Sequence, residues 1–130
     1  MTEIAEPLAK FHVKVAQGRR FTLPEATRLR YDIEEGYYIE VIVRLIDKET
    51  KEIVGRGHFV PKVSRFGMIT IPKGLCEKLG IEKGDVLEVL LIDYFSIHDI
   101  LGERAKKLRN VLRHGFEVLD PLQERQLLMR

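Results

Sequence analysis

The sequence of 130 residues predicts a mainly β protein with short helices, built from two tandem β-β-α-β repeats and a helical C-terminal extension. Three observations predict this fold class. Two segments resemble one another without gaps, and each contains runs with the period-2 alternation that is typical of strands. From Ser96 onward, apolar residues instead recur every three or four positions, which is typical of helices.

The repeat relates residues 11–43 to residues 59–91 by a shift of 48 positions, as from Pro24 to Pro72. A unit this short buries little core alone, so we expect the copies to pack together with approximate twofold symmetry within one chain. The identical pairs are Phe11/Phe59, Lys14/Lys62, Val15/Val63, Thr22/Thr70, Pro24/Pro72, Ile33/Ile81, Glu34/Glu82, Gly36/Gly84, Glu40/Glu88 and Val41/Val89.

The same order of elements is predicted in both copies. Alternating apolar residues predict the strands, a proline suits the start of each short helix, and Gly80 suits the left-handed position after the second helix. The recurring Glu40 and Glu88 are each expected to pair with a basic residue. The predicted elements are strands 11–15, 21–23 and 37–46 with helix 25–31, a return strand 52–60, then strands 59–63, 68–71 and 86–92 with helix 73–79.

The C-terminal extension is predicted to contain two helices. Ser96 with Asp99 forms a plausible cap for the first helix, and Gly115 is a stop signal for it. Asp120 followed by Pro121 predicts the start of the last helix. We therefore expect one domain over residues 10–95, with repeats 11–46 and 59–94, a helical extension over residues 96–130, and a frayed leader over residues 1–9.

The charge balance and the metal-ligating residue types exclude several kinds of site. The 22 basic and 20 acidic residues leave a net charge of +2, which permits nucleic-acid binding only where the charges are segregated. The lone Cys76 excludes an intramolecular disulfide and a cysteine-rich metal site. The four histidines are widely separated in sequence, so no metal or other cofactor is expected.

Composition also bears on location and growth temperature. The apolar runs are shorter than the roughly 18 residues of a membrane span, and the first residues lack the pattern of a secretory signal, so a cytoplasmic location is expected. Abundant lysine, arginine and glutamate with little asparagine and glutamine resembles the composition of thermophile proteins.

The most specific motif is the string GMITIPKGLCEKLGIEKGDVLEV, residues 67–89. It resembles the AbrB/SpoVT family of swapped-hairpin DNA-binding domains, whose pattern has a glycine, a basic residue and a proline before a short helix, then L-G-I-x-x-G-D-x-[LV]-E-V. The departure is Met68, where the family usually has a basic residue. The first copy matches more weakly but keeps that basic residue as Arg20. The resemblance covers about residues 10–94.

In that family two chains interleave their hairpins into one small β-barrel, and basic turns and helix starts contact DNA. The resemblance therefore implies a pseudo-twofold swapped-hairpin β-barrel closed within a single chain. It implies a basic surface that is stronger on the first half, because Met68 and Cys76 occupy the second-half equivalents of two basic positions. The implied DNA-binding residues are Lys14 and Lys62 on the first strands, Arg20 and Arg28 on either side of Pro24, and the turn residues Arg19 and Arg65, which are expected to compensate.

These observations lead to a principal hypothesis and an alternative. The principal hypothesis is a DNA-binding transcription regulator of the AbrB-like type that contacts double-stranded DNA through basic hairpin turns. The alternative is a protein-interaction module, antitoxin-like or a scaffold subunit of a nucleoprotein complex, in which the turn arginines are solvated residues. A homo-oligomer formed through residues 96–130 is the further partner expected. No nucleophile elbow or phosphate-binding loop is present in the sequence, so an enzyme is not expected.

Overall fold

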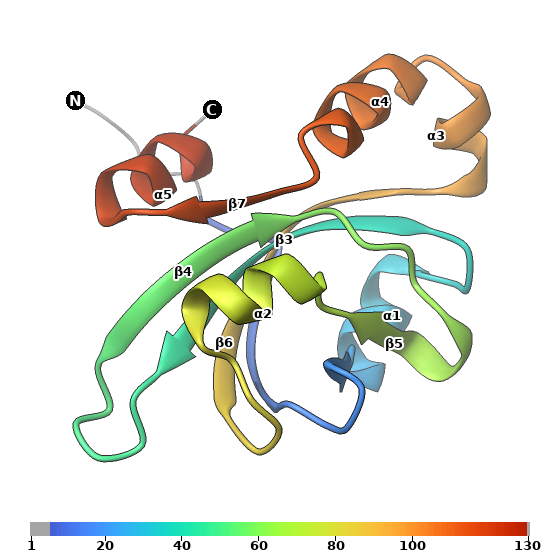
Figure 1. Cartoon of the computed structure of the whole chain (residues 1–130). Helices are drawn as coiled ribbons and strands as arrows, with labels where there is room; N and C mark the ends of the chain where they lie inside the picture. Colours follow the sequence, from blue (N-terminus) through green and yellow to red (C-terminus); the bar gives the residue numbers. More distant parts are fainter. Residues whose placement is uncertain (1–5, 130) are drawn as a thin grey trace.

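The computed structural model describes residues 6–129, which form two antiparallel sheets and several short helices (Figure 1). The larger sheet has five strands in the order β1-β6-β3-β4-β7, and the smaller one pairs β2 with β5. The elements are β1 (Ala9–Lys14), β2 (Arg20–Thr22), α1 (Glu25–Tyr31), β3 (Tyr38–Ile46), β4 (Ile53–Phe59), the 3-10 helix η1 (Arg65–Gly67), β5 (Met68–Thr70), α2 (Lys73–Leu79), β6 (Val86–Phe95), α3 (Ile97–Leu101), α4 (Ala105–Arg113), β7 (Phe116–Leu119) and α5 (Pro121–Leu128).

The two central strands, β3 and β6, are buried on both faces, which explains their long β-branched and aliphatic runs. Val41 and Val89 face the main core, where they pack with the two-stranded sheet and α2. Ile42 and Leu90 face the other side, where α5 covers them with Leu127 and Leu128 of its last turn. The strands therefore lie between two layers of side chains.

The backbone pairing repeats itself at positions 48 residues apart. Phe11 pairs with Val89, and Phe59 pairs with Val41. At the centre of the large sheet, Ile42 of β3 pairs with its own repeat equivalent, Leu90 of β6. The first strand of each half thus pairs with the last strand of the other half, and the helices α1 and α2 begin and end at equivalent residues.

The predicted closed barrel is wrong, because both sheets are open within the described residues. The two-stranded sheet pairs only over Arg20–Thr22 and Met68–Thr70. It contacts the larger sheet through the buried side chains of Phe21 and Ile69 instead of through a continuous hydrogen-bond ladder. Side-chain burial therefore joins the two sheets where the prediction had backbone pairing.

The C-terminal extension is not only helical. After α4 the chain turns at Gly115, whose φ is +66°, and adds β7 to the free edge of β4. The predicted caps at Ser96 and at Asp120 are confirmed, since both form capping boxes. The predicted single helix after Ser96 is divided into α3 and α4, because the backbone of Gly102 is extended there.

The N-terminal leader predicted for residues 1–9 lies partly outside the described residues, as does residue 130 of the predicted extension. Within the described part, the amide of Leu8 already donates to the carbonyl of Leu91 (2.8 Å), and β1 begins at Ala9. Residues 8 and 9 are thus part of the sheet edge and not of a frayed segment. Among the helices of residues 6–129, none is both long and apolar enough to span a bilayer.

Close packing of α2 on β4 leads to a stability prediction at Gly57. A Cβ atom added there would lie 2.7 Å from Leu75 Cδ1 and 2.8 Å from Leu75 Cδ2, and Leu75 is fully buried. We expect Gly57→Ala to lower the free energy of unfolding by about 2 kcal/mol, because α2 must move away from the sheet. Chemical denaturation measures this change. Val54→Ala on the exposed side of the same strand is the control, and an equal effect of both variants would contradict the packing argument.

Candidate nucleic-acid interface

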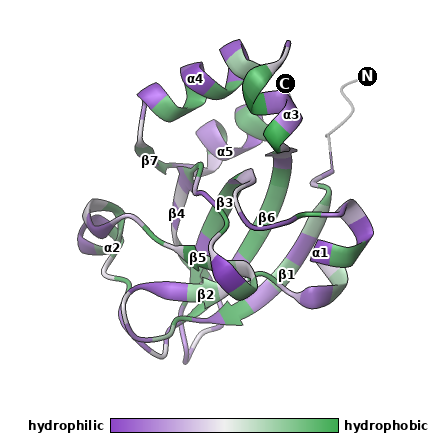
Figure 2. Cartoon of the chain, turned by 90° about the vertical axis from the view of Figure 1, so that its right-hand side faces the viewer, coloured by the Kyte–Doolittle hydropathy of each residue, from purple (hydrophilic) through white to green (hydrophobic). Residues whose placement is uncertain are grey.

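The two-stranded sheet of β2 and β5, with the turn that precedes each strand, is here named the ribbon (residues 16–22 and 64–70). Figure 2 shows β2 and β5 between α1 and α2, at the end of the molecule opposite α3 and α4. Phe21 and Ile69 are buried beneath the ribbon, whereas Arg20, Thr22 and Thr70 are exposed. The alternation of three-residue strands thus leaves a polar and basic outer surface over an apolar base.

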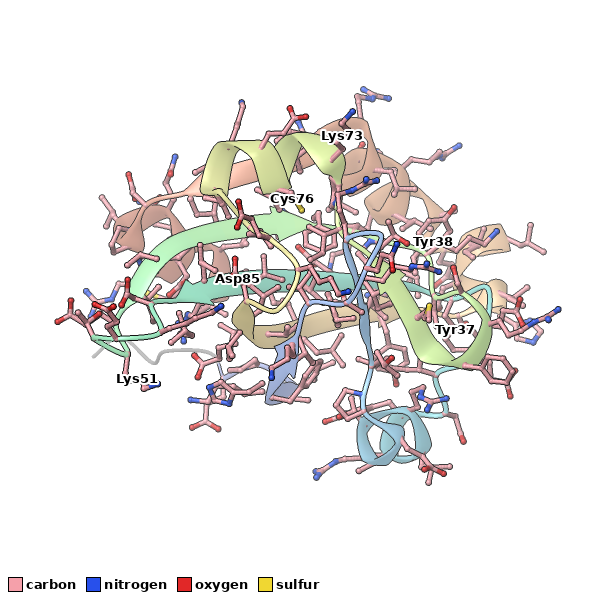
Figure 3. All side chains as sticks on the ribbon, turned by 60° about the horizontal axis from the view of Figure 1, so that its bottom comes forward. Tyr37, Tyr38, Lys51, Lys73, Cys76 and Asp85 are labelled. Atoms are coloured by element: carbon pink, nitrogen blue, oxygen red, sulfur yellow. The ribbon has the colours of Figure 1, made fainter. Side chains whose placement is uncertain are left out.

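Arg19, in the turn before β2, is hydrogen-bonded to the second half of the chain. Arg19 has a left-handed backbone, with φ +58°, and its Nε donates to the carbonyl of Ile71 at 3.2 Å. The amide of Ile71 in turn donates to the carbonyl of Arg19 at 2.8 Å. Burial raises the pKa of the Cys76 thiol in α2, and the nearby charge of Arg19 opposes that rise. Arg19 is thus bonded to the residue two places before α2, whose residues Lys73 and Cys76 are labelled in Figure 3.

The turn before β5 is bound in the same way to the first half. The amide of Leu23 donates to the carbonyl of Gly67 at 2.8 Å, and the Nε of Arg28 donates to the carbonyl of Leu23 at 3.1 Å. A Cβ atom at Gly67 would lie 2.7 Å from Arg28 Nε, so only glycine allows the guanidinium to cross the turn this closely.

The two guanidinium groups are equivalent in space, although their residues are not equivalent in the repeat. Their acceptors, the carbonyls of Leu23 and Ile71, are related by the 48-residue shift. In one site the arginine is Arg28 of α1, and the turn residue beside it is the small Gly67. In the other site the arginine is Arg19 of the turn, and the helix residue equivalent to Arg28 is the smaller Cys76. The expectation of a basic surface stronger on the first half is therefore not what the structure has, because each end of the ribbon receives one guanidinium.

Arg20 covers the position at which the second copy lacks a basic residue. Its Nη1 lies 3.6 Å from the sulfur of Met68, and its Nε donates to the carbonyl of Gln17 at 3.3 Å. The guanidinium of Arg20 thus lies over the equivalent of its own position in the other half. Arg65 is exposed in the second turn.

Lys14 and Lys62 occupy equivalent edge positions. Lys14 pairs with Val86, and Lys62 forms a bridge with Tyr38, whose ring centroid lies 6.0 Å from the Lys62 ammonium. Both lysines are exposed. Lys14 is the last residue of β1 in the first half, and Lys62 is the equivalent residue of the second half. The predicted residues therefore come from both halves of the chain.

Positive charge without paired carboxylates distinguishes this end of the molecule. Within residues 6–129, none of the six predicted DNA-binding residues forms an ion pair, and the hydrogen bonds of Arg19 and Arg28 go to carbonyl oxygens. Elsewhere Arg44, Arg56 and Arg104 each contact a carboxylate. The positive charges of these six residues are therefore not offset by a paired carboxylate and are available to an anionic ligand.

The recurring glutamates have the structural role that the sequence predicted. Glu40 contacts the Nε2 of His58 at 2.7 Å, and Glu88 accepts from Arg44 at 2.6 Å. Neither lies on the ribbon. Among the described residues, no group of three histidine, cysteine, aspartate or glutamate side chains is arranged to hold a metal ion.

One exposed residue of the ribbon was missed by the sequence prediction. Phe66, in the second turn, is 78% exposed and has a left-handed backbone, with φ +61°. The signal was present in the repeat, because the 48-residue shift aligns Phe66 with Gly18. A bulky residue aligned with a turn glycine indicates either strain or function.

The chain is similar to a known family and to a solved structure. Residues 61–94 match the family described as antidote-toxin recognition MazE, bacterial antitoxin. The chain is also similar to the solution structure of PHS018 from Pyrococcus horikoshii, with 35% identity over 70% of this chain and 96% of that chain and a TM-score of 0.61. No match is found among curated proteins. The matched family is a regulatory antitoxin and DNA-binding type and not an enzymatic one. The chain therefore belongs to the same family as PHS018, and its residues 61–94 form a MazE antitoxin-type domain of the AbrB-like swapped-hairpin superfamily.

Proposed function

We propose that this protein is a DNA-binding transcription regulator that contacts duplex DNA with the ribbon. The observation that carries the proposal is the pair of guanidinium groups, Arg19 and Arg28, held by equivalent carbonyls at the two ends of the ribbon. Each donates through Nε to the protein, which leaves its terminal nitrogens for phosphate oxygens or base edges. Arg20, Arg65, Lys14 and Lys62 add positive charge around them.

The proposed interface has a twofold character inside one chain. We infer that residues 11–46 and 59–94 are two copies of a swapped-hairpin unit, packed within a domain over residues 10–95. The support is the repeated pairing, in which the first strand of each half lies beside the last strand of the other half. Such an arrangement presents two similar basic ends to two stretches of a DNA backbone, as a symmetric dimer does.

The experiment that tests this proposal is a salt series with the full chain and duplex DNA. If all six predicted residues neutralise phosphates, log Kd against log salt concentration has a slope of about 5 in magnitude, because each contact releases about 0.9 counterion. Fluorescence anisotropy with a labelled pool of random duplexes measures the slope. Absence of binding at low salt, or an affinity indifferent to salt, would refute the proposal.

The family match favours a second candidate, an antitoxin-like module that binds a protein partner. Several apolar side chains outside the ribbon are exposed, among them Leu101 and Leu122, and are available for such contacts or for a homo-oligomer through residues 96–130. A small nuclease encoded beside this gene would be the partner to test. A stable complex in gel filtration together with inhibition of the nuclease would favour this function, and DNA binding with no such complex would favour the first.

A further inference from the structure

Phe66 is the aromatic residue at the tip of the second turn. In the free protein, the backbone conformation of Phe66 is strained and its apolar ring is exposed to solvent. The backbone is left-handed, with φ 61° and ψ 24°, a region that is sterically unfavourable for a residue with a side chain. The ring is 78% exposed, so it recovers little of that cost by burial.

The repeat shows that the turn does not require this residue. The equivalent position in the first turn is Gly18, which has φ +81° and serves the same turn without strain. Folding alone therefore gives no reason for phenylalanine at position 66. A residue that is strained and exposed in the free protein can be explained by a bound state that uses it.

The backbone of the turn is tied by hydrogen bonds, and basic residues flank the ring. Gly67 is fixed by the hydrogen bond from Leu23 and by the close guanidinium of Arg28, and Arg65 precedes the ring directly. These arginines attract phosphate groups, with which an apolar ring has no favourable interaction. The π-faces of stacked bases between two phosphate backbones are a surface that does suit such a ring.

We propose that Phe66 inserts as an apolar wedge into duplex DNA, partly unstacking one base step and kinking the duplex there. This inference rests on the proposed function. The ligand is a duplex with a deformable pyrimidine–purine step beneath the second turn, because such steps unstack most readily. Since Gly18 presents no ring at the other end, the kink lies on one side of the pseudo-twofold axis, and the two ends of the ribbon read DNA differently.

The test uses the tightest duplex that the wild-type protein selects from a random pool. The variants are Phe66→Gly, which restores the residue of the other turn, and Phe66→Leu, which keeps an apolar wedge. Val54→Ala in β4 is the control for loss of an exposed apolar side chain, since Val54 is 59% exposed and lies outside the ribbon. Anisotropy gives the affinity, end-to-end energy transfer gives the bend, and 2-aminopurine placed at successive steps reports the unstacked base.

We expect Phe66→Gly to bind about tenfold more weakly, the equivalent of about 1.4 kcal/mol, because loss of one base–aromatic contact has effects of this order. The slope against salt stays unchanged, the bend and the 2-aminopurine signal disappear, and the melting temperature does not fall. Phe66→Leu keeps most of the bend, and Val54→Ala behaves as the wild type does.

Outcomes that overturn the wedge differ from those that overturn DNA binding itself. If the wild type binds DNA with a steep salt dependence while Phe66→Gly binds and bends it equally, the wedge is wrong and the proposed function stands. If Phe66→Gly instead loses only the binding of a protein partner, the ring belongs to that interface. If the wild type does not bind duplex DNA at any salt concentration, the proposed function fails, and the wedge fails with it.

Discussion

The double variant Arg19→Gly/Arg20→Gln is expected to bind duplex DNA about 100-fold more weakly than the wild type, with the salt slope reduced by about 2. Each arginine supplies one charge-assisted contact, whose loss is worth about 1.5 kcal/mol. Glycine at position 19 suits the left-handed backbone that Arg19 has, and the equivalent Gly67 shows that the turn accepts it. The variant thus removes the guanidinium groups without straining the fold.

A matched control exists in the turn that joins β3 to β4. Lys51 also has a left-handed backbone, with φ +64°, and Lys48 lies three residues before it. The variant Lys51→Gly/Lys48→Gln makes the same change in net charge and the same relief of backbone strain, but outside the ribbon, in the turn that carries Lys51 (Figure 3). We expect it to keep wild-type affinity within about threefold, since distant exposed charges are screened at 0.15 M salt. Equal losses in both double variants would show that net charge, and not the ribbon, determines binding.

The second large effect concerns stability and the attachment of α5. Glu124 is only 6% exposed and accepts from Arg44 at two atoms, Nε at 3.0 Å and Nη2 at 2.6 Å. The Nε of Arg56 also lies 3.0 Å from Glu124, although its angle does not suit a hydrogen bond. Hydrogen bonding to Glu124 first, and then to Glu88, raises the pKa of Arg44. One carboxylate of α5 therefore bridges the two arginines beneath it, and Glu88 also pairs with Arg44.

Glu124→Ala is expected to lower the free energy of unfolding by about 3 kcal/mol, because it removes the carboxylate beside Arg56 and leaves Arg44 with Glu88 alone. For a domain of this size that corresponds to a melting temperature lower by about 10 °C. Differential scanning calorimetry or denaturation by guanidinium chloride measures the change. DNA affinity should not change, since α5 and the ribbon are separate.

Glu117→Ala is the control for this prediction, because Glu117 is exposed in the neighbouring strand β7. We expect it to change the free energy of unfolding by less than about 0.5 kcal/mol. A similarly small effect of Glu124→Ala would mean that water replaces the carboxylate, and that the ion pairs do not attach α5 to the sheet.

Local signals in the sequence were sufficient for the short elements. Helices 25–31 and 73–79 were predicted with the bounds that the structure has, because a proline precedes each and a left-handed residue follows each. Those left-handed residues are Asp32 and Gly80. The caps at Ser96 and Asp120 were also predicted, the first from Asp99 three residues later and the second from Pro121 directly after it. Such signals depend on residues within one turn of each other, so the sequence states them directly.

The strand β7 was missed, although residues 116–119 alternate in the sequence as a strand does. Four residues after a helix are too few for a periodic pattern to stand out. What makes the segment a strand is the free edge of β4, where Val118 pairs with Gly57, and the contact of Phe116 with α2 at Gly74. Both partners are distant in the sequence, so the strand depends on tertiary contacts.

The sequence by itself predicted a 48-residue repeat and determined the short elements and the likeness to a DNA-binding family. Only the tertiary structure decided how the basic side chains are distributed. In sequence Arg19 and Arg28 both belong to the first half, but in space they occupy equivalent sites at opposite ends of the ribbon. The physical reason is that a guanidinium group reaches several ångströms from its backbone. A small residue such as Gly67 or Cys76 can therefore leave a site that an arginine from another element fills, and no alignment of positions reveals the exchange.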